Sequence, residues 1–244
     1  MKVIALVDPL SGGHHEIYLK LFSESLVSLG YRVMLFSVKP KEMEEMINGE
    51  AQIDASMVRF FKAPELADKD SLFSGLWGFS TGRKRWQAMR ASIEEAALSS
   101  GWNPDMVFIA WLDSYLNFFA GHGKVDSIFP YDWSGLYFHP IRVRVPDSSL
   151  LPESINVYGT LKSSGCKAVT VLDEGVADKL QERLEGKHVI AFPDIADDPP
   201  PDRAFSVLKK IKKKAKGRKI VTMIGSIEER KGIMPLLEVA QSAS

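Results

Sequence analysis

The fold of this chain is decided near its start by residues 2–15, which read KVIALVDPLSGGHH. Residues 2–7 form a short apolar run with β-branched members, which is typical of a strand buried on both faces. Pro9 ends this strand, and Gly12 and Gly13 allow the backbone to turn sharply because they carry no Cβ atom. A helix is predicted next, so the turn would present free N–H groups and a positive dipole end to an anion.

The predicted helix covers residues 14–29 and is followed by Gly30, a residue that typically ends helices. Its expected apolar face consists of Ile17, Leu21, Phe22, Ser25 and Leu29. Residues 31–37 resemble a second buried strand, so the chain opens with a β-α-β unit that has parallel strands and a right-handed crossover. The two glycines match neither the dinucleotide fingerprint nor the P-loop, and a plain tight turn is the competing interpretation.

The same alternation of strands and helices continues through the middle of the chain. Further strands are predicted at residues 56–61, 106–111, 134–138, 168–172 and 188–192, and helices at residues 41–48, 82–100, 115–120, 153–164 and 174–184. Residues 62–80 form a long connection, interpreted as a lid on its own domain or as a wall that faces an acceptor or a membrane. About seven strands with intervening helices indicate an α/β domain with a Rossmann-like, doubly wound parallel sheet.

A change of composition near residue 195 predicts a domain boundary. Residues 1–194 are predicted to form the Rossmann-like domain, and residues 195–202 form a stiff linker rich in Pro and Asp. Residues 203–244 then indicate a helix at 203–217, a strand at 219–224 and a helix at 232–241, the incomplete start of a second α/β domain. Because one such unit cannot bury a core, we expect that the chain is truncated or that this part docks on another surface.

The helix predicted at residues 203–217 is rich in lysine. We interpret the lysines as a solvated face, with Phe205, Leu208 and Ile211 turned inward, rather than as a patch for nucleic acid. The whole chain has 31 Lys and Arg against 31 Asp and Glu, so its net charge gives no case for nucleic-acid binding.

The single cysteine, Cys166, leaves no internal disulfide and favours a reducing, cytoplasmic compartment. No signal peptide is visible, and no apolar run approaches the roughly 20 residues of a membrane span. Neither peripheral contact with a membrane nor a homodimer is decided by these features.

The chain has 5 His at no metal-ligand spacing, and His14 and His15 are adjacent and cannot chelate together, so no metal site is predicted. Without a G-x-S-x-G motif, and with no His near Cys166, a hydrolase nucleophile is not indicated either.

Four segments in this order resemble the retaining glycosyltransferases of the two-Rossmann-domain (GT-B) architecture, specifically family 4. They are residues 12–16, His139 after a mid-domain strand, residues 169–174 with 190–194, and residues 219–233. The first resembles that family's Gly-Gly-x-Glu turn, and the third resembles its strand, helix and V-I-P-N-G exit from the first domain. The fourth is similar to the G-R-x-x-x-x-K-G-I opening of its second domain.

The resemblance implies an enzyme that moves a sugar from a nucleotide-diphosphate donor, with retention of configuration and without a metal or other cofactor. Gly12 and Gly13 would lie near the donor diphosphate or sugar, and Lys231 would contact the diphosphate as a compact positive charge. His139 would lie by the transferred sugar as the catalytic residue. The competing interpretations are a buried, hydrogen-bonded histidine for His139 and a solvated helix residue for Lys231.

The chain departs from the family pattern at two places. Ser226 stands where the family usually has an Arg, so that contact with the diphosphate is lost or is supplied by Arg230. The family's pair of glutamates, separated by seven residues, would lie beyond Ser244. Without that pair the nucleotide base and ribose cannot be held as they are in the family, so we expect the 244-residue chain alone to be inactive.

The acceptor is expected in a cleft formed by the Gly12 turn with His14, residues 62–80 and residues 139–142. Arg142 and Arg144 favour an anionic carbohydrate or lipid-linked acceptor that carries phosphate, or they form ordinary surface ion pairs. Two other classes of protein stay open. One is a non-catalytic Rossmann-type binding or scaffold protein that lacks a donor site, and the other is a nucleotide-sugar epimerase with the same two-domain plan.

Overall fold

The structure is a computed structural model, and it describes residues 1–12, 14–50, 53–64, 66, 78–116, 124–140, 157–193, 206–216, 218 and 232–242. The chain divides into two compact units, Met1–Ile195 and Ala196–Ser244. Every strand of the described sheet belongs to the first unit.

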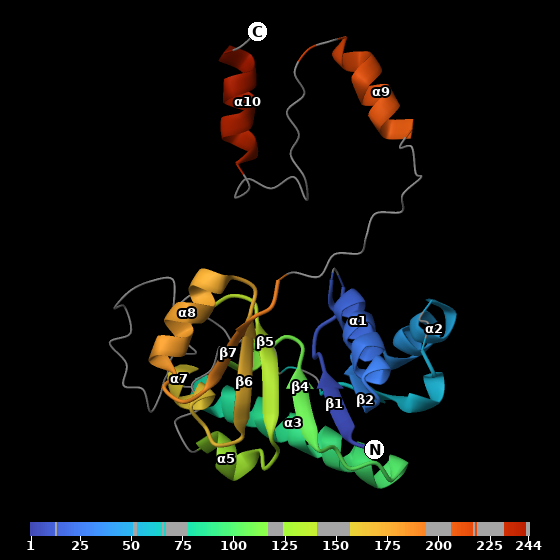
Figure 1. Ribbon diagram of the computed structural model, residues 1–244, viewed down its shortest axis with the longest axis vertical. Coiled ribbons are helices and arrows are strands. Elements are labelled where there is room, and N and C mark those ends of the chain that lie inside the picture. Colours follow the sequence, from blue (N-terminus) through green and yellow to red (C-terminus); the bar gives the residue numbers. More distant parts are fainter. Residues whose placement is uncertain are drawn as a thin grey trace. The chain divides into compact units, whose positions relative to one another are not determined.

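Parallel strands form one sheet of seven in the described part of the first unit (Figure 1). They are β1 (Val3–Val7), β2 (Arg32–Ser37), β3 (Val58–Lys62), β4 (Met106–Ile109), β5 (Trp133–Tyr137), β6 (Cys166–Val171) and β7 (His188–Ala191). Their order is β3-β2-β1-β4-β5-β6-β7, so the chain builds the sheet outward from β1 in one direction and then in the other. This doubly wound arrangement confirms the Rossmann-like α/β fold that the sequence predicts.

Helices cover both faces of this sheet (Figure 1). They are α1 (His15–Ser28), α2 (Pro40–Glu50), the 3₁₀ turn η1 (Ala55–Met57), α3 (Gly78–Ser100), α4 (Asp113–Leu116), α5 (Lys124–Ile128), α7 (Val157–Leu161) and α8 (Glu174–Arg183). Ala5 of β1 belongs to the core under α3 to α8, whereas Leu6 belongs to the core under α1 and α2. Because successive side chains of a strand point to opposite faces, the apolar run of β1 supplies both cores.

The buried face of α1 differs from the one that the sequence predicts. The structure buries Tyr18, Leu19, Phe22 and Ser23. Ile17 is 44% exposed, Leu29 is 72% exposed and Ser25 is exposed as well, so the predicted face is wrong for these three residues. Apolar residues occur all round this helix, so its periodicity leaves the inward side ambiguous. Packing of Phe22 against Phe108 of β4 selects that side.

The predicted elements that fall on described residues are present, with ends shifted by a few residues. The sequence does not predict α5, because 5 residues are too few to show a helical period. Residues 67–77 of the long connection, residues 117–120 and 153–156 of two predicted helices, the linker at 195–202 and the strand predicted within 219–224 lie outside the described residues.

The second unit contains α9 (Ser206–Ala215) and α10 (Ile233–Ser242). The sequence predicts that Ile211 of α9 is turned inward, but this residue is 40% exposed, so that prediction is wrong. No described element of the unit covers Ile211 enough to bury it. In the part of the chain that the structure describes, no helix combines the length and apolar character needed to cross a membrane.

Candidate functional site

The carboxyl ends of β1, β4 and β5 lie side by side in the middle of the sheet. The direction of chain winding reverses between β1 and β4, and open α/β sheets bind their ligands outside the carboxyl ends of strands at such a reversal. The side chains that gather here are Asp8 after β1, Trp111 and Asp113 after β4, His139 after β5, and His15 in the first turn of α1.

A buried carboxylate holds the imidazole of His15. His15 Nδ1 lies 2.9 Å from Asp8 Oδ2, and the side chain of Asp8 is 1% exposed against 14% for His15. The other carboxylate oxygen of Asp8 accepts the backbone N–H of Leu10 at 3.0 Å. When Asp8 is ionised, its carboxylate only accepts hydrogen bonds, so Nδ1 of His15 is then the nitrogen that carries the proton and donates it. Nε2 of His15 is therefore the nitrogen that can take a proton from a bound group.

Burial and mutual contact shift the pKa values of this pair. Burial raises the pKa of Asp8, and the hydrogen bond and charge of His15 offset only part of this effect. Burial lowers the pKa of His15, but the hydrogen bond and the charge of Asp8 outweigh burial, so the pKa of His15 is raised overall. An imidazole in this setting can accept a proton from a hydroxyl group and then be held as an imidazolium by the carboxylate.

Aromatic rings surround Trp111 at the end of β4. The indole stacks on Phe138 with a centroid separation of 3.9 Å and an interplanar angle of 22°. The ring of His15 lies 4.5 Å from the indole, and the ring of His139 lies 5.9 Å from it. Trp111 as a whole residue is half-buried at this edge of the sheet. An indole presented in this way is a platform for the face of a sugar or another ring.

A second carboxylate fixes the chain after β5. The backbone N–H groups of Phe138 and His139 donate to the two carboxylate oxygens of Asp113 at 2.8 and 2.9 Å. Asp113 is the first residue of α4, and its carboxylate bonds to the backbone at the end of β5. Burial raises the pKa of Asp113, and these two backbone bonds lower it in part.

His139 lies above this carboxylate on the exposed side. Its Nδ1 is 3.4 Å from Asp113 Oδ1, and its side chain is 62% exposed. The competing interpretation of His139 as a buried histidine is therefore wrong. The exposed imidazole can reach a bound molecule, while its backbone is held by Asp113.

In the glycine turn before α1, the backbone is hydrogen-bonded to the carboxylate of Glu16. Gly12 has a φ of 86°, a conformation that favours glycine. Its N–H donates to both carboxylate oxygens of Glu16, at 2.9 and 3.0 Å. A donor phosphate at this N–H would have to displace Glu16. His14, the N-cap residue of α1, is exposed, and its side chain makes no capping hydrogen bond.

Several residues that the sequence proposes for the site lie outside the described residues. They are Gly13, Arg142, Arg144, Arg230 and Lys231. Gly12, His14 and His139 are described, and all three belong to segments at the carboxyl edge of the sheet. Within the described ranges, no three His, Cys, Asp or Glu side chains are grouped so that they could hold a metal ion.

The sequence alone did not indicate the contact between His15 and Asp8 or the contacts of Trp111 with two imidazoles. One signal was present, because Asp8 directly follows the first strand and polar residues at that position face the ligand edge of an α/β sheet. Trp111 also lies two residues before Asp113 in the segment after β4. The close approach of His15 to Asp8 depends on the path of the glycine turn, which the sequence alone does not specify.

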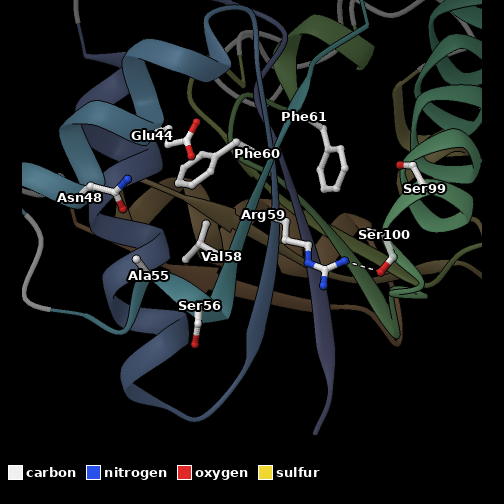
Figure 2. Close-up of a pocket in the computed structure, with 10 residues that line it drawn as sticks. All are labelled: Glu44, Asn48, Ala55, Ser56, Val58, Arg59, Phe60, Phe61, Ser99 and Ser100. Carbon is white, nitrogen blue, oxygen red and sulfur yellow. Dashed lines mark hydrogen bonds between the residues drawn. The ribbon is translucent and has the colours of Figure 1, made fainter.

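A separate open cavity of about 590 Å³ lies beside β3, the edge strand of the sheet. Figure 2 shows Phe60 and Phe61 on opposite sides of this strand, with Phe60 near Glu44. The Arg59 guanidinium donates to the carbonyl of Ser100 and lies 4.2 Å from the Trp102 ring. The positive charge of Arg59 therefore already has partners within the protein. None of the residues at the carboxyl edge lines this cavity.

No protein-family model matches this chain, and no curated protein matches it. Solved structures with a partly similar fold include Arabidopsis thaliana UGT89C1 complexed with UDP, at 12% identity and a TM-score of 0.44 over 88% of this chain and 54% of that one. Phytolacca americana apo UGT2 matches at 14% identity and a TM-score of 0.48, over 87% of this chain and 55% of that one.

Sucrose-phosphate synthase from Thermosynechococcus elongatus matches at 15% identity and a TM-score of 0.43, over 80% of this chain and 91% of that one. The chain spans about half the length of the two plant proteins, at 54% and 55%. At these identities and TM-scores the similarities describe the arrangement of strands and helices and carry no argument about activity.

Proposed function

We propose that this chain is the acceptor-side part of a glycosyltransferase, which moves a sugar from a nucleotide-sugar donor to an acceptor hydroxyl. The observation that carries the proposal is the His15 imidazole, held by the buried Asp8 carboxylate beside the ring of Trp111. The pair lies at the winding reversal of the sheet, where ligands of this fold class bind. The four segments that resemble GT-B enzymes of family 4 add support from the sequence.

In the proposed reaction, Nε2 of His15 takes the proton of the acceptor hydroxyl while Asp8 stabilises the imidazolium. The acceptor oxygen forms a bond to the anomeric carbon of the sugar. The bond from that carbon to the diphosphate oxygen breaks, and its electron pair leaves with the nucleoside diphosphate. Trp111 would support a ring of the sugar or acceptor, and the exposed His139 would contact the transferred sugar.

A general base in this position favours a single displacement, which inverts the configuration at the anomeric carbon. The resemblance to family 4 instead predicts retention, without a metal, with the leaving diphosphate bound by Gly12, Gly13, Lys231 and Arg230. Identifying the anomer of the product by proton NMR distinguishes the two outcomes. An inverted product supports His15 as the base, and a retained product removes His15 from that role.

The test of the function is sugar transfer by the full product of the gene, with this 244-residue chain assayed alongside it. A panel of radiolabelled nucleotide sugars is supplied with mixed carbohydrate and lipid-linked acceptors. We expect His15→Gln to lower the transfer rate by about 10²- to 10⁴-fold, the usual contribution of a general base. His188→Gln is the matched control, because His188 is an exposed histidine on β7 and should leave the rate unchanged.

A non-catalytic binding protein is the second candidate, and one observation favours it. Glu16 already occupies the N–H of Gly12, where a donor phosphate would have to bind. Calorimetry with the same nucleotide sugars separates the two candidates. The absence of both binding and turnover of any nucleotide sugar by the full gene product would support the binding protein, and turnover would exclude it.

A further inference from the structure

Helix α9 of the second unit carries an unusual density of positive charge. Lysines occupy positions 209, 210, 212, 213, 214 and 216, and Arg218 follows them. No Asp or Glu occurs between residues 203 and 227. All seven cationic residues are exposed, and no ion pair links them to a carboxylate within the described ranges.

The cations and the apolar residues lie on different sides of this helix. At about 100° per residue, Lys209, Lys210 and Lys213 share one face, and Ile211 lies nearly opposite Lys213. Ala215, one turn after Ile211, continues the apolar side and is half-buried. Lys212 and Lys214 flank the apolar side. The result is a basic amphipathic helix with an exposed isoleucine at its centre.

Repulsion among the lysines of α9 destabilises the helix when no partner is bound. Lys209 and Lys213 are four residues apart, as are Lys210 and Lys214, and like charges at this spacing destabilise a helix. Only the cations of the last turn gain from the helix dipole. An anionic partner would remove the repulsion along the whole helix, and an apolar environment would bury Ile211.

We propose that α9 binds in the plane of an anionic phospholipid surface. The lysine amines contact the lipid phosphates, and Ile211 enters the boundary between headgroups and acyl chains. Nucleic acid offers phosphates as well, but it has no continuous apolar layer beneath them for Ile211, so the arrangement of α9 favours a membrane. The inference goes beyond the proposed transfer reaction and does not depend on it.

Vesicle sedimentation tests whether the chain requires an anionic lipid surface. We expect the 244-residue chain to bind vesicles of phosphatidylcholine with phosphatidylglycerol, to bind pure phosphatidylcholine at least tenfold more weakly, and to lose affinity as salt rises. Replacing Lys209, Lys210 and Lys213 by Gln should weaken binding about 100-fold, since each cation contributes about fivefold. The matched control replaces the exposed Lys41, Lys84 and Lys179 by Gln, with the same change of net charge, and should bind like the original chain.

Insertion of the apolar side is tested at Ile211. Cys166 is 1% exposed, so an Ile211→Cys variant can be labelled at the new thiol with an environment-sensitive fluorophore. A blue shift on adding anionic vesicles supports insertion, and Ile211→Ser should bind about tenfold more weakly. Far-UV circular dichroism checks that each variant keeps its helix content.

Three results would overturn the proposal. They are equal binding to neutral and anionic vesicles, binding without a blue shift at position 211, and binding to single-stranded RNA or DNA that is tighter than to vesicles at equal phosphate concentration. The last result would assign α9 to nucleic acid. Each result is independent of whether His15 supports sugar transfer.

Discussion

His15 is the residue whose proton should set the pH dependence of transfer. The base must be neutral to accept a proton, and the pKa of His15 is raised above 6.5 because the hydrogen bond and charge of Asp8 outweigh burial. We therefore expect kcat/KM to fall as the pH drops, with a midpoint above 6.5.

Asp8→Asn removes the charge that raises this pKa and leaves burial, which lowers it. The midpoint should then move to lower pH, while the maximal rate falls because the imidazolium is no longer stabilised. Rate profiles of the two proteins between about pH 5 and 9 measure this shift. An unchanged midpoint would mean that His15 is not the titrating base.

Gly12 shows at the residue scale how one contact limits what a turn can bind. Its backbone conformation fits the sequence prediction for a glycine turn, but both carboxylate oxygens of Glu16 accept its N–H. The carboxylate of Glu16 therefore occupies the position in the turn where the sequence predicts that an anion of the ligand binds. Whether the site accepts a diphosphate depends on displacing a side chain that is only four residues away.

At the scale of elements, the close packing of β4 and β5 requires a glycine at position 135. A Cβ atom there would lie 2.7 Å from the carbonyl oxygen of Ile109 and 3.2 Å from the Cβ atoms of Ile109 and Leu112. The nearest of these atoms belongs to backbone, so the two strands would have to separate. We expect Gly135→Ala to lower the free energy of unfolding by about 1–3 kcal/mol, measured by urea denaturation.

Gly49 provides the matched control for this substitution. It lies within α2, and a Cβ atom there would meet nothing within 4 Å. Gly49→Ala should leave the stability unchanged or raise it by up to about 1 kcal/mol, because alanine favours a helix. Equal stability of the two variants would show that β4 and β5 can move apart without loss.

The buried strands were predictable because each is a run of apolar residues that must be covered on both faces. Val33 to Phe36 of β2, for example, are all fully buried, and the sequence shows four consecutive apolar residues there. The short α5 was not predictable, since 5 residues give no periodic pattern. The inward side of α1 was not predictable either, because apolar residues surround that helix.

At the scale of the whole molecule, both hydrophobic cores of the described residues lie in the first unit. The last residues along the chain that pack against them are Ala191 and Phe192. A chain that ends at Ile195 keeps every one of these residues. We expect it to unfold in one cooperative transition, with a free energy of unfolding within about 1 kcal/mol of that of the longer chain.

Circular dichroism during thermal and urea unfolding measures this prediction, with the 244-residue chain as the control. Loss of the cooperative transition in the shorter chain would contradict it. That result would mean that residues after 195 contribute to the stability of the sheet.

The sequence by itself determined the alternation of strands and helices, the class of fold and the placement of a glycine turn and His139 after strands. These features follow from local patterns, since a short apolar run is buried whichever element covers it. Only the tertiary structure decided that β4 lies beside β1, that Asp113 holds the backbone after β5, and that His15 contacts Asp8. The physical reason is that such contacts depend on where the chain returns after each crossover, and no local pattern specifies that position.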